Sequence, residues 1–260
     1  MLEVTDLTHS YGRGSAAHMA IDGISLKAAQ GELVSIVGPS GCGKSTVLRC
    51  IAGLQRPARG AITVNGVAVH GTVPDRLAVV FQDYSRSLYP WLSVRDNVAL
   101  PLLHTEPRRA ARREAAQRAL AAVGLKDAAH RYPWQLSGGM QQRVAIARAI
   151  ACDPVLLLMD EPFGSVDAQT REDLEDLVLR LRRDREITIL LVTHDIDESV
   201  YVGDRVLVLT GAPGRVRADL AVHLPEPRDQ IATKELPEFV HLRTETGRLI
   251  RGQQASAAHQ

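Results

Sequence analysis

The sequence predicts an α/β fold in which helices cover a parallel β-sheet. Four apolar runs of strand length support this prediction, at residues 32–38, 154–160, 187–195 and 204–210. Valine, isoleucine and leucine fill these runs, which is typical of strands buried on both faces of a parallel sheet. Helical patterns lie between the later runs, so we expect parallel connections through helices.

The composition agrees with one large domain, or with one domain and a small subdomain, in a chain of 260 residues. With 45% apolar and 23% charged residues, the chain resembles an ordinary globular protein that buries its core without disulfides. The formal net charge of +1 gives no support for a nucleic-acid-binding surface. We therefore expect no nucleic-acid partner.

The cysteines Cys42, Cys50 and Cys152 show neither CxxC spacing nor companion histidines. A disulfide scaffold and a zinc site are not expected, and a reduced cytosolic setting fits. No apolar run approaches the roughly 20 residues that a membrane helix needs. The N-terminus, MLEVTDLTHS, carries acidic residues and no long apolar stretch, so we also expect no signal peptide.

The N-terminal part is expected to form short β-strands around a strand–loop–helix unit. The strand at 32–38 leads into a glycine-rich loop and then a helical stretch. An Asn65-Gly66 pair indicates a hairpin turn. The other elements expected in this part are strands at 2–11 and 20–29, a helix at 45–54, a hairpin at 60–69 and a buried strand at 76–83.

Residues from about 88 to 153 change character and predict a helical insertion. The stretch 104–124 is rich in alanine and arginine with helical spacing, and its arginines are interpreted as a solvated helix face. After Pro225, an amphipathic stretch near FVHLRTETGRLI is expected to be peripheral. We predict a main domain over residues 1–225, with the helical subdomain at 88–153 inserted, and a C-terminal tail over 226–260.

Residues 38–46 read GPSGCGKST and match the phosphate-loop pattern G-x-x-x-x-G-K-[ST]. Glycines let backbone N–H groups turn toward an anion, and the following helix adds the positive end of its dipole. Lys44 is expected on the β and γ phosphates, and Ser45 offers its hydroxyl to Mg²⁺. Cys42 lies inside the loop, where a structural role is favoured over oxidation sensitivity.

Carboxylates and polar side chains follow three of the predicted strands. Asp160 and Glu161 end the run 154–160, where Asp160 fits a Mg²⁺ ligand and Glu161 could position or deprotonate a water. His194 could orient the attacking water beside the γ phosphate. Gln82 could reach Mg²⁺ or the same water.

The segment LSGGMQQR (136–143) resembles the signature motif of ATP-binding cassette (ABC) ATPases. The other motifs of that family follow in the expected order over roughly residues 1–225. The resemblance implies a P-loop NTPase with a RecA-like parallel sheet core, an N-terminal antiparallel β subdomain and an inserted α-helical subdomain. It also implies Mg²⁺-dependent ATP hydrolysis.

The resemblance assigns roles to individual residues. Tyr11 corresponds to the aromatic residue that stacks on adenine, Gln82 to the Q-loop glutamine, and His194 to the switch-loop histidine. Asp160 and Glu161 correspond to the Walker B pair. The implied metal ligands are Ser45, Gln82 and Asp160, and the implied catalytic residues are Lys44, Gln82, Glu161 and His194. The implied ATP-binding residues are Tyr11, Gly38, Pro39, Ser40, Gly41, Cys42, Gly43, Lys44, Ser45, Thr46, Ser137, Gly138, Gly139 and Asp167.

The signature segment also has a physical interpretation of its own. Ser137 is a good N-cap for a helix over MQQRVAIARAI, and Gly138-Gly139 permit close backbone approach. This arrangement makes a second anion-binding helix end. In the family a second copy of the domain supplies that end, so the resemblance implies a homodimer that buries two ATP molecules. Asp167 keeps the D-loop aspartate, although Ser165 and Val166 depart from the common pattern and predict altered packing there.

The segment 81–102 resembles the ATPases of importers for nitrate, sulfonates, taurine and related small anions, as do GAPGRV (211–216) and LPEPRD (224–229). This resemblance implies separate integral membrane permease subunits, an extracytoplasmic solute-binding protein and a position on the cytoplasmic face of the bacterial inner membrane. Either some of the side chains of Leu88, Tyr89, Pro90 and Trp91 line the groove that receives a short permease helix, or these side chains pack the helical subdomain internally. The alternatives are an exporter ATPase, a soluble non-transport ABC protein, or a nucleotide-binding module without catalysis.

Overall fold

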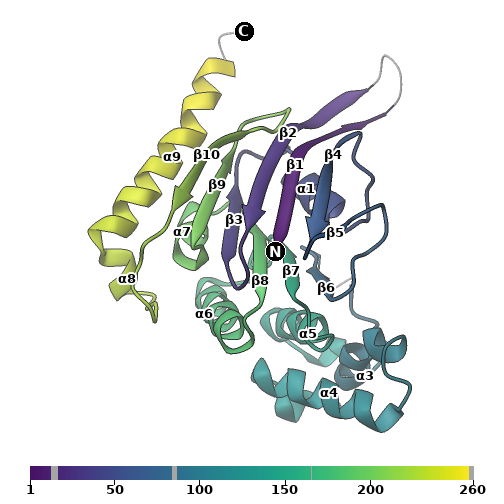
Figure 1. Cartoon of the computed structure of the whole chain (residues 1–260). Coiled ribbons are helices and arrows are strands. Elements are labelled where there is room, and N and C mark those ends of the chain that lie inside the picture. The colour runs from purple at the N-terminus through teal and green to yellow at the C-terminus, as the bar shows by residue number, and fades with distance from the viewer. Residues whose placement is uncertain (13–16, 84–86, 165, 258–260) are drawn as a thin grey trace. The chain divides into compact units, whose positions relative to one another are not determined.

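The structure is a computed structural model that describes residues 1–12, 17–83, 87–164 and 166–257 (Figure 1). The chain divides into two compact units. The first unit comprises Met1–Asp75 and Thr188–Gln260, and the second comprises Arg76–Ile187. Each unit is described separately below.

The first unit contains an antiparallel sheet built from the N-terminal strands. Strand β1 (Leu2–Tyr11) lies between β2 (His18–Ala28) and β4 (Arg59–Val64), and β4 also pairs with the short β5 (Val67–Ala68). Asn65 and Gly66 between β4 and β5 both have positive φ, which matches the two-residue hairpin turn predicted from this Asn-Gly pair. The expected N-terminal β region is therefore confirmed.

The first unit also contains three parallel strands. The strand β3 (Leu33–Val37) pairs in parallel with β8 (Thr188–Val192) and with β9 (Arg205–Leu209). Every residue of β3 and β8 is buried, as the unbroken apolar runs predicted. Strand β10 (Val216–Ala221) pairs antiparallel with β9 and was not predicted. Its residues are only partly buried and include charged side chains, so no apolar run marks it.

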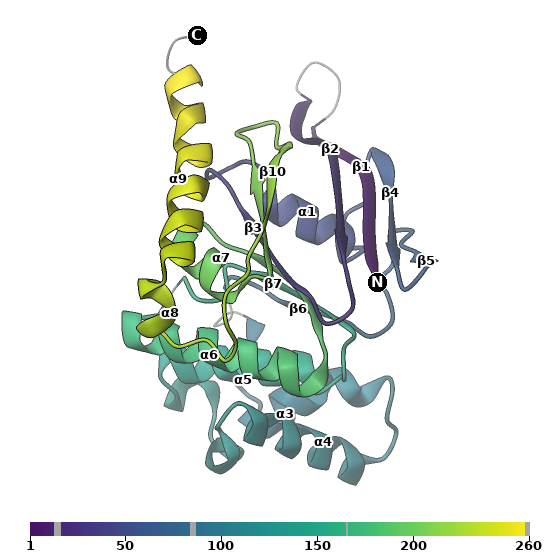
Figure 2. The same cartoon turned by 60° about the vertical axis from the view of Figure 1, so that its left-hand side comes forward.

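The helices described in the first unit follow two of its parallel strands or lie near the C-terminus. Helix α1 (Lys44–Ile51) follows β3 through the loop 38–43, and α7 (Ile196–Val202) follows β8. The chain ends in α8 (Ala232–Glu235) and α9 (Pro237–Ala257), and α9 packs on α7, β9 and β10 (Figure 2). Within the described residues, no helix is long and apolar enough to cross a membrane.

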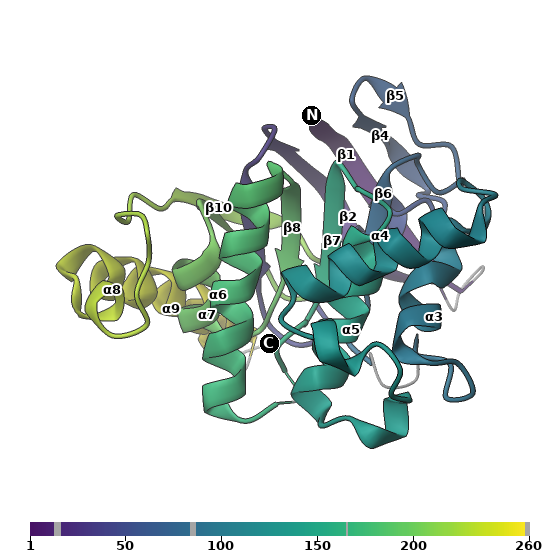
Figure 3. The ribbon, with the colours of Figure 1, turned by 90° about the horizontal axis from the view of Figure 1, so that it is seen from below.

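The second unit combines one parallel strand pair with helices. Strands β6 (Leu77–Val80) and β7 (Leu156–Asp160) run parallel. The helices α3, α4 and α5 lie between these two strands in the sequence and pack against one another (Figure 3). Helix α6 follows β7. The helical segments of this unit are α3 (Val94–Ala99), η2 (Leu100–Leu103), α4 (Arg109–Ala122), η3 (Lys126–Ala128), η4 (Pro133–Gln135), α5 (Gly138–Ile150) and α6 (Ala168–Arg185).

Candidate functional site

The phosphate-loop pattern folds into a turn that surrounds the Lys44 ammonium group. Lys44 is only 6% exposed, and its Nζ donates to the carbonyl oxygens of Gly38 at 2.8 Å and Pro39 at 3.1 Å. Helix α1 begins directly after Gly43, and no side chain caps its first turn. The lysine charge and the N-terminal amides of α1 therefore belong to the same loop, which is the donor set that a phosphate group needs.

Glycines in this loop are required by contacts behind it. A Cβ atom on Gly43, whose φ is +91°, would lie 2.4 Å from Cγ2 of Ile21 and 2.7 Å from the carbonyl oxygen of Ala20. A Cβ atom on Gly38 would lie 3.0 Å from the carbonyl oxygen of Leu209. The pattern glycines thus allow the loop to pack closely against strands β2 and β9.

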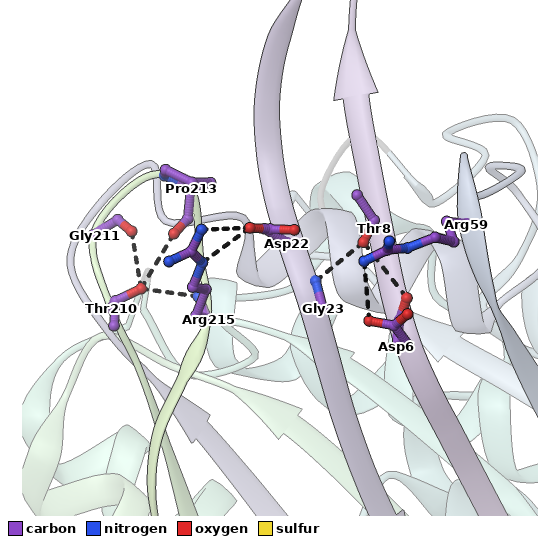
Figure 4. Close-up of polar contacts among 9 residues, drawn as sticks. All are labelled: Asp6, Thr8, Asp22, Gly23, Arg59, Thr210, Gly211, Pro213 and Arg215. Atoms are coloured by element: carbon purple, nitrogen blue, oxygen red, sulfur yellow. Dashed lines mark hydrogen bonds and ion pairs between the residues drawn. The ribbon is translucent and has the colours of Figure 1, made fainter.

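The segment 211–216 also contacts the phosphate loop. A Cβ atom on Gly214 would lie 2.0 Å from the carbonyl oxygen of Cys42, and Gly214 exchanges backbone hydrogen bonds with Ala20 and Asp22. Arg215 forms an ion pair with Asp22, and Thr210 Oγ1 accepts from the Arg215 amide at 2.8 Å (Figure 4). Sequence analysis used the motif GAPGRV only as a mark of a subfamily. In the structure this motif packs against the phosphate loop and stabilises it.

Tyr11 lies beside the phosphate loop at the end of β1. Its hydroxyl is 3.1 Å from Oγ1 of Thr46 and donates to Oε1 of Gln55 at 3.0 Å. The ring remains 39% exposed, so a flat ligand can reach it. The structure thus brings Tyr11 next to Thr46 of the phosphate loop, while its contact with adenine stays a prediction.

Burial raises the pKa of the Cys42 thiol, although Lys44 opposes this effect. The thiol is fully buried within the loop. A raised pKa lowers the thiolate fraction at neutral pH and therefore the reactivity of the sulfur. The structural role of Cys42 is favoured over the oxidation-sensitive one.

The signature segment forms the exposed N-terminus of α5. The Ser137 hydroxyl accepts from the Met140 amide at 3.3 Å, which confirms that Ser137 is the N-cap. A Cβ atom on Gly139 would lie 2.3 Å from Cγ2 of Thr170 in α6. Gly139 is thus needed for packing of α5 on α6, which sequence analysis did not anticipate.

Asp167 fixes the start of α6 and the orientation of Thr170. Its carboxylate accepts from the Thr170 amide at 3.0 Å and from the Thr170 hydroxyl at 2.7 Å. These hydrogen bonds lower the pKa of Asp167. Because they orient the Thr170 methyl group toward Gly139, the D-loop aspartate and the signature glycine are connected through one side chain. Ser165 lies outside the described residues, and its predicted packing stays a prediction.

The acidic pair lies at the end of β7. Asp160 is 8% exposed, while Glu161 has a φ of +46° in the left-handed region. A non-glycine residue in this region costs about 1–3 kcal/mol and is found preferentially at functional sites. Gln82 Nε2 donates to Oε2 of Glu161 at 2.9 Å. Sequence analysis placed Gln82 near a metal or water but did not predict this contact.

His194 lies on an exposed turn that neighbouring side chains hold in place. The Thr193 hydroxyl donates to the buried Glu198 carboxylate and accepts from the Asp195 amide at 3.0 Å. Asp195 in turn caps α7 by accepting from the Glu198 amide at 3.1 Å. The turn is therefore anchored on both sides of His194.

The four bulky residues after Gln82 divide into two groups. Leu88 is 3% exposed and packs inside the second unit, which agrees with the alternative of internal packing for this residue. Tyr89, Pro90 and Trp91 are exposed, with Trp91 reaching 70%, and the two aromatic rings contact each other edge to face. The side chain of Asn97 holds this segment by binding the Tyr89 backbone at 2.8 and 3.0 Å.

Sequence analysis missed residues that support the site rather than form it. Two of them carry a signal that can be read afterwards: Gly214 lies in a singled-out motif, and Thr170 follows Asp167 at the spacing of a helix cap. Glu198 gives no such signal, because only the folded chain buries it, and Gln142 lies in the singled-out segment LSGGMQQR but carries no sign there of its buried contact. Gln142 donates to the carbonyl oxygen of Pro162, directly after Glu161.

Residues 21–164 match the family described as ABC transporter. The matched segment contains the phosphate loop, the signature helix and the acidic pair described above. The chain belongs to the ABC transporter family, and the predicted family and fold class are confirmed.

Two of the similar relatives are ATP-binding proteins of transport systems for small anions. It is 45% identical to the bicarbonate transport ATP-binding protein CmpC of Synechococcus elongatus over 239 residues, which is 89% of this chain and 35% of that protein. It is 42% identical to the nitrate import ATP-binding protein NrtD of the same organism, covering 88% of this chain and 83% of that protein. The chain thus spans about a third of CmpC but most of NrtD.

Solved structures support the same assignment. The dimeric structure of MJ0796, a bacterial ABC transporter cassette, aligns with a TM-score of 0.76 and 34% identity over 86% of this chain and 99% of that one. A post-hydrolysis state of the same cassette bound to ADP and phosphate aligns with a TM-score of 0.75.

Proposed function

We propose that the protein is the ATP-hydrolysing subunit of an ABC importer for a small anionic solute. The observation that carries this proposal is the presence of two anion-binding helix ends in one chain. One is the phosphate loop with the buried Lys44 ahead of α1, and the other is the Ser137-capped end of α5. A phosphate loop alone fits many nucleotide-binding proteins, whereas the second end fits the ABC mechanism.

In this proposal the phosphate loop binds the β and γ phosphates of ATP. Lys44 and the amides of residues 38–46 stabilise negative charge, and Tyr11 packs against the adenine. The burial of the ammonium group and the position of Tyr11 beside Thr46 support these roles. The exposed part of the Tyr11 ring provides the surface for the base.

The hydroxyl of Ser45, the carboxylate of Asp160 and the amide of Gln82 are the proposed metal ligands. Their oxygen atoms suit Mg²⁺, which prefers hard oxygen ligands. Mg²⁺ held by these residues would neutralise charge on the nucleotide phosphates. Glu161 accepts the proton of the attacking water, Gln82 holds the Glu161 carboxylate, and His194 orients the water.

We propose that two copies of the chain complete the site. Ser137, Gly138 and Gly139 of one copy would meet the ATP held by the other, and Asp167 would contribute to the same interface. The exposure of Ser137 and Gly138 supports this arrangement, and the aligned cassette MJ0796 is itself described as dimeric. A lone chain would then bind ATP and hydrolyse it poorly.

The proposed partners are integral membrane permease subunits, with an extracytoplasmic solute-binding protein acting on them. The names of CmpC and NrtD refer to bicarbonate transport and nitrate import, which supports a small anion as the solute. The exposed Tyr89 and Trp91 offer an aromatic surface for a permease segment. The chain would lie on the cytoplasmic face of the bacterial inner membrane.

We propose the domain organisation predicted from the sequence. Residues 1–225 would form the ABC ATPase domain, with the helical subdomain inserted at about 88–153, and residues 226–260 would form the tail. The helices α3, α4 and α5 fall within the inserted range, and α8 and α9 fall within the tail, which supports these boundaries.

The variant Glu161→Gln tests the catalytic assignment. Loss of a general base lowers the rate by about 10²–10⁴-fold, so phosphate release should fall by that factor while ATP binding persists. Light scattering should then detect an ATP-dependent dimer. The matched control Glu114→Gln, on the exposed surface of α4, should behave like wild type.

Two results would contradict the proposal at different points. Rapid hydrolysis by Glu161→Gln would remove Glu161 from the reaction. A wild-type protein that releases no phosphate, even when assembled with its permease, would contradict the ATPase function itself.

A further inference from the structure

Four side chains form one continuous hydrogen-bonded network beside the phosphate loop. His9 Nδ1 lies 3.1 Å from the carbonyl oxygen of Arg56, and Gln55 Nε2 lies 2.8 Å from His9 Nε2. The network continues through the Tyr11 hydroxyl to Oγ1 of Thr46, as described above. We call His9, Gln55, Tyr11 and Thr46 the Tyr11 network.

The chemistry of the donors and acceptors assigns one direction to each hydrogen bond in the Tyr11 network. A carbonyl oxygen only accepts, so His9 Nδ1 must carry the proton. The Gln55 amide nitrogen only donates, so His9 Nε2 must accept, which requires the same neutral form of the ring. Gln55 Oε1 only accepts, so the Tyr11 hydroxyl donates to it and receives from Thr46.

The network restrains the Tyr11 ring as well as its hydroxyl. The His9 and Tyr11 rings lie 4.9 Å apart between centroids at an interplanar angle of 78°, which is a favourable edge-to-face contact. His9 and Thr46 are both buried, whereas Tyr11 is 39% exposed. Two buried residues therefore hold an exposed ring in one orientation.

We propose that Gln55 and His9 are positioning residues that set the affinity of the protein for the nucleotide base. They would do so by fixing the Tyr11 ring before the nucleotide arrives, which reduces the ordering cost of binding. This inference rests on the proposed function, because it assumes that Tyr11 packs against adenine. Neither Gln55 nor His9 needs to touch the nucleotide.

The network also connects the base to the phosphate loop. Thr46 is the last residue of the pattern GPSGCGKST, and it lies in α1 two residues after Lys44. Gln55 follows the end of α1 and packs back toward β1 through His9 and Tyr11. Binding of the base at Tyr11 would therefore be coupled to the position of α1 relative to β1.

The experiment compares binding of ADP with binding of inorganic pyrophosphate by calorimetry. Gln55→Leu should weaken ADP binding by about 3- to 10-fold, the loss expected for one net hydrogen bond, and leave pyrophosphate binding unchanged. In hydrolysis assays KM for ATP should rise while kcat stays near wild type. Leu54→Ala, an exposed neighbour, is the matched control and should change neither ligand.

A double-mutant cycle shows whether Gln55 acts through Tyr11. Tyr11→Phe keeps the ring but removes the hydroxyl, so it should weaken ADP binding by a similar factor. Gln55→Leu in that background should add no further loss, because the two residues act as a unit. His9→Ala should shift ADP binding in the same direction.

Three outcomes would overturn the inference: unchanged ADP affinity in Gln55→Leu, an equal loss for ADP and pyrophosphate, or losses that multiply in the double variant. Wild-type protein is the reference for the proposed function. If wild type binds ADP and hydrolyses ATP while the variants behave as in one of these outcomes, the inference alone fails. If wild type binds neither ligand, the proposed function fails.

Discussion

The two helix ends that define the site, at α1 and α5, are built in different ways. The end of α1 has a glycine cap without a side-chain hydrogen bond. Strands β2 and β9 and the segment 211–216 pack closely against its loop. The end of α5 has a serine cap, is exposed, and is held through Gly139 and Thr170. The first end suits a ligand that the chain binds by itself, and the second suits a ligand presented by another molecule.

The largest expected effect comes from blocking the exposed end. Ser137→Arg places a long side chain where a second copy would approach, so ATP hydrolysis should fall by about 10²–10³-fold, as when a stabilising donor is lost. Nucleotide binding by a single chain should stay within about twofold of wild type. Phosphate release and equilibrium binding measure the two quantities, and loss of both together would contradict the comparison.

Removing the charge from the phosphate loop should weaken nucleotide binding by a single chain, which the change at Ser137 leaves intact. Lys44→Ala eliminates a charge-assisted contact worth about 1.5–3 kcal/mol, so ATP binding by a single chain should weaken about 10- to 100-fold. Fluorescence titration with a nucleotide analogue measures this loss. Unchanged affinity would show that the buried ammonium group does not serve the nucleotide.

A smaller effect tests how α5 is held. Gly139→Ala adds a Cβ atom 2.3 Å from the Thr170 methyl group and should lower the free energy of unfolding by about 1–3 kcal/mol. Thr170→Ser removes that methyl group but keeps the hydroxyl for Asp167, so it should suppress the loss. Chemical denaturation of the single and double variants measures this, and additive losses would disprove the contact.

The smallest effect concerns α1 itself. Burial raises the pKa of Cys50 to about 11, above its value in the unfolded chain, so the neutral thiol favours the folded state. Stability from this group is present below about pH 8.5 and is lost as the pH rises toward 11, with a loss of about 1 kcal/mol between about pH 8.5 and pH 9.5. Cys50→Ala should flatten that part of the pH dependence, and an unchanged slope would contradict the buried thiol.

Much of the structure around the two helix ends, at α1 and α5, could be predicted because both have strong local sequence patterns. The buried strands, the loop 38–46, the Asn65-Gly66 turn and the Ser137 cap depend on residues close together in the chain. Strand β10 was missed, and the burial of Leu88 could not be decided, because edge strands and interior positions depend on neighbours distant in sequence. The contacts of Gly139 with Thr170 and of Gly214 with Cys42 have the same origin.

The phosphate-loop pattern itself assigns roles to Lys44 and Ser45, whereas the roles of Gln82 and His194 depend mainly on the resemblance, because no spacing rule assigns chemistry to either residue alone. The structure adds the physical context for these residues, such as the hydrogen bond from Gln82 to Glu161. The contact requires Gln82 and Glu161, which are 79 residues apart in sequence, to meet after folding. No local pattern contains that information.

The buried side chain of Gln142 has a mechanical consequence. It projects from α5 and donates to the backbone carbonyl oxygen one residue beyond Glu161, so a buried hydrogen bond connects the helix to the acidic turn. A displacement of the N-terminal end of α5 would therefore be transmitted to the turn that carries Glu161. If two copies of the chain associate as proposed, their contact at this helix end would change the position of Glu161 through the protein alone.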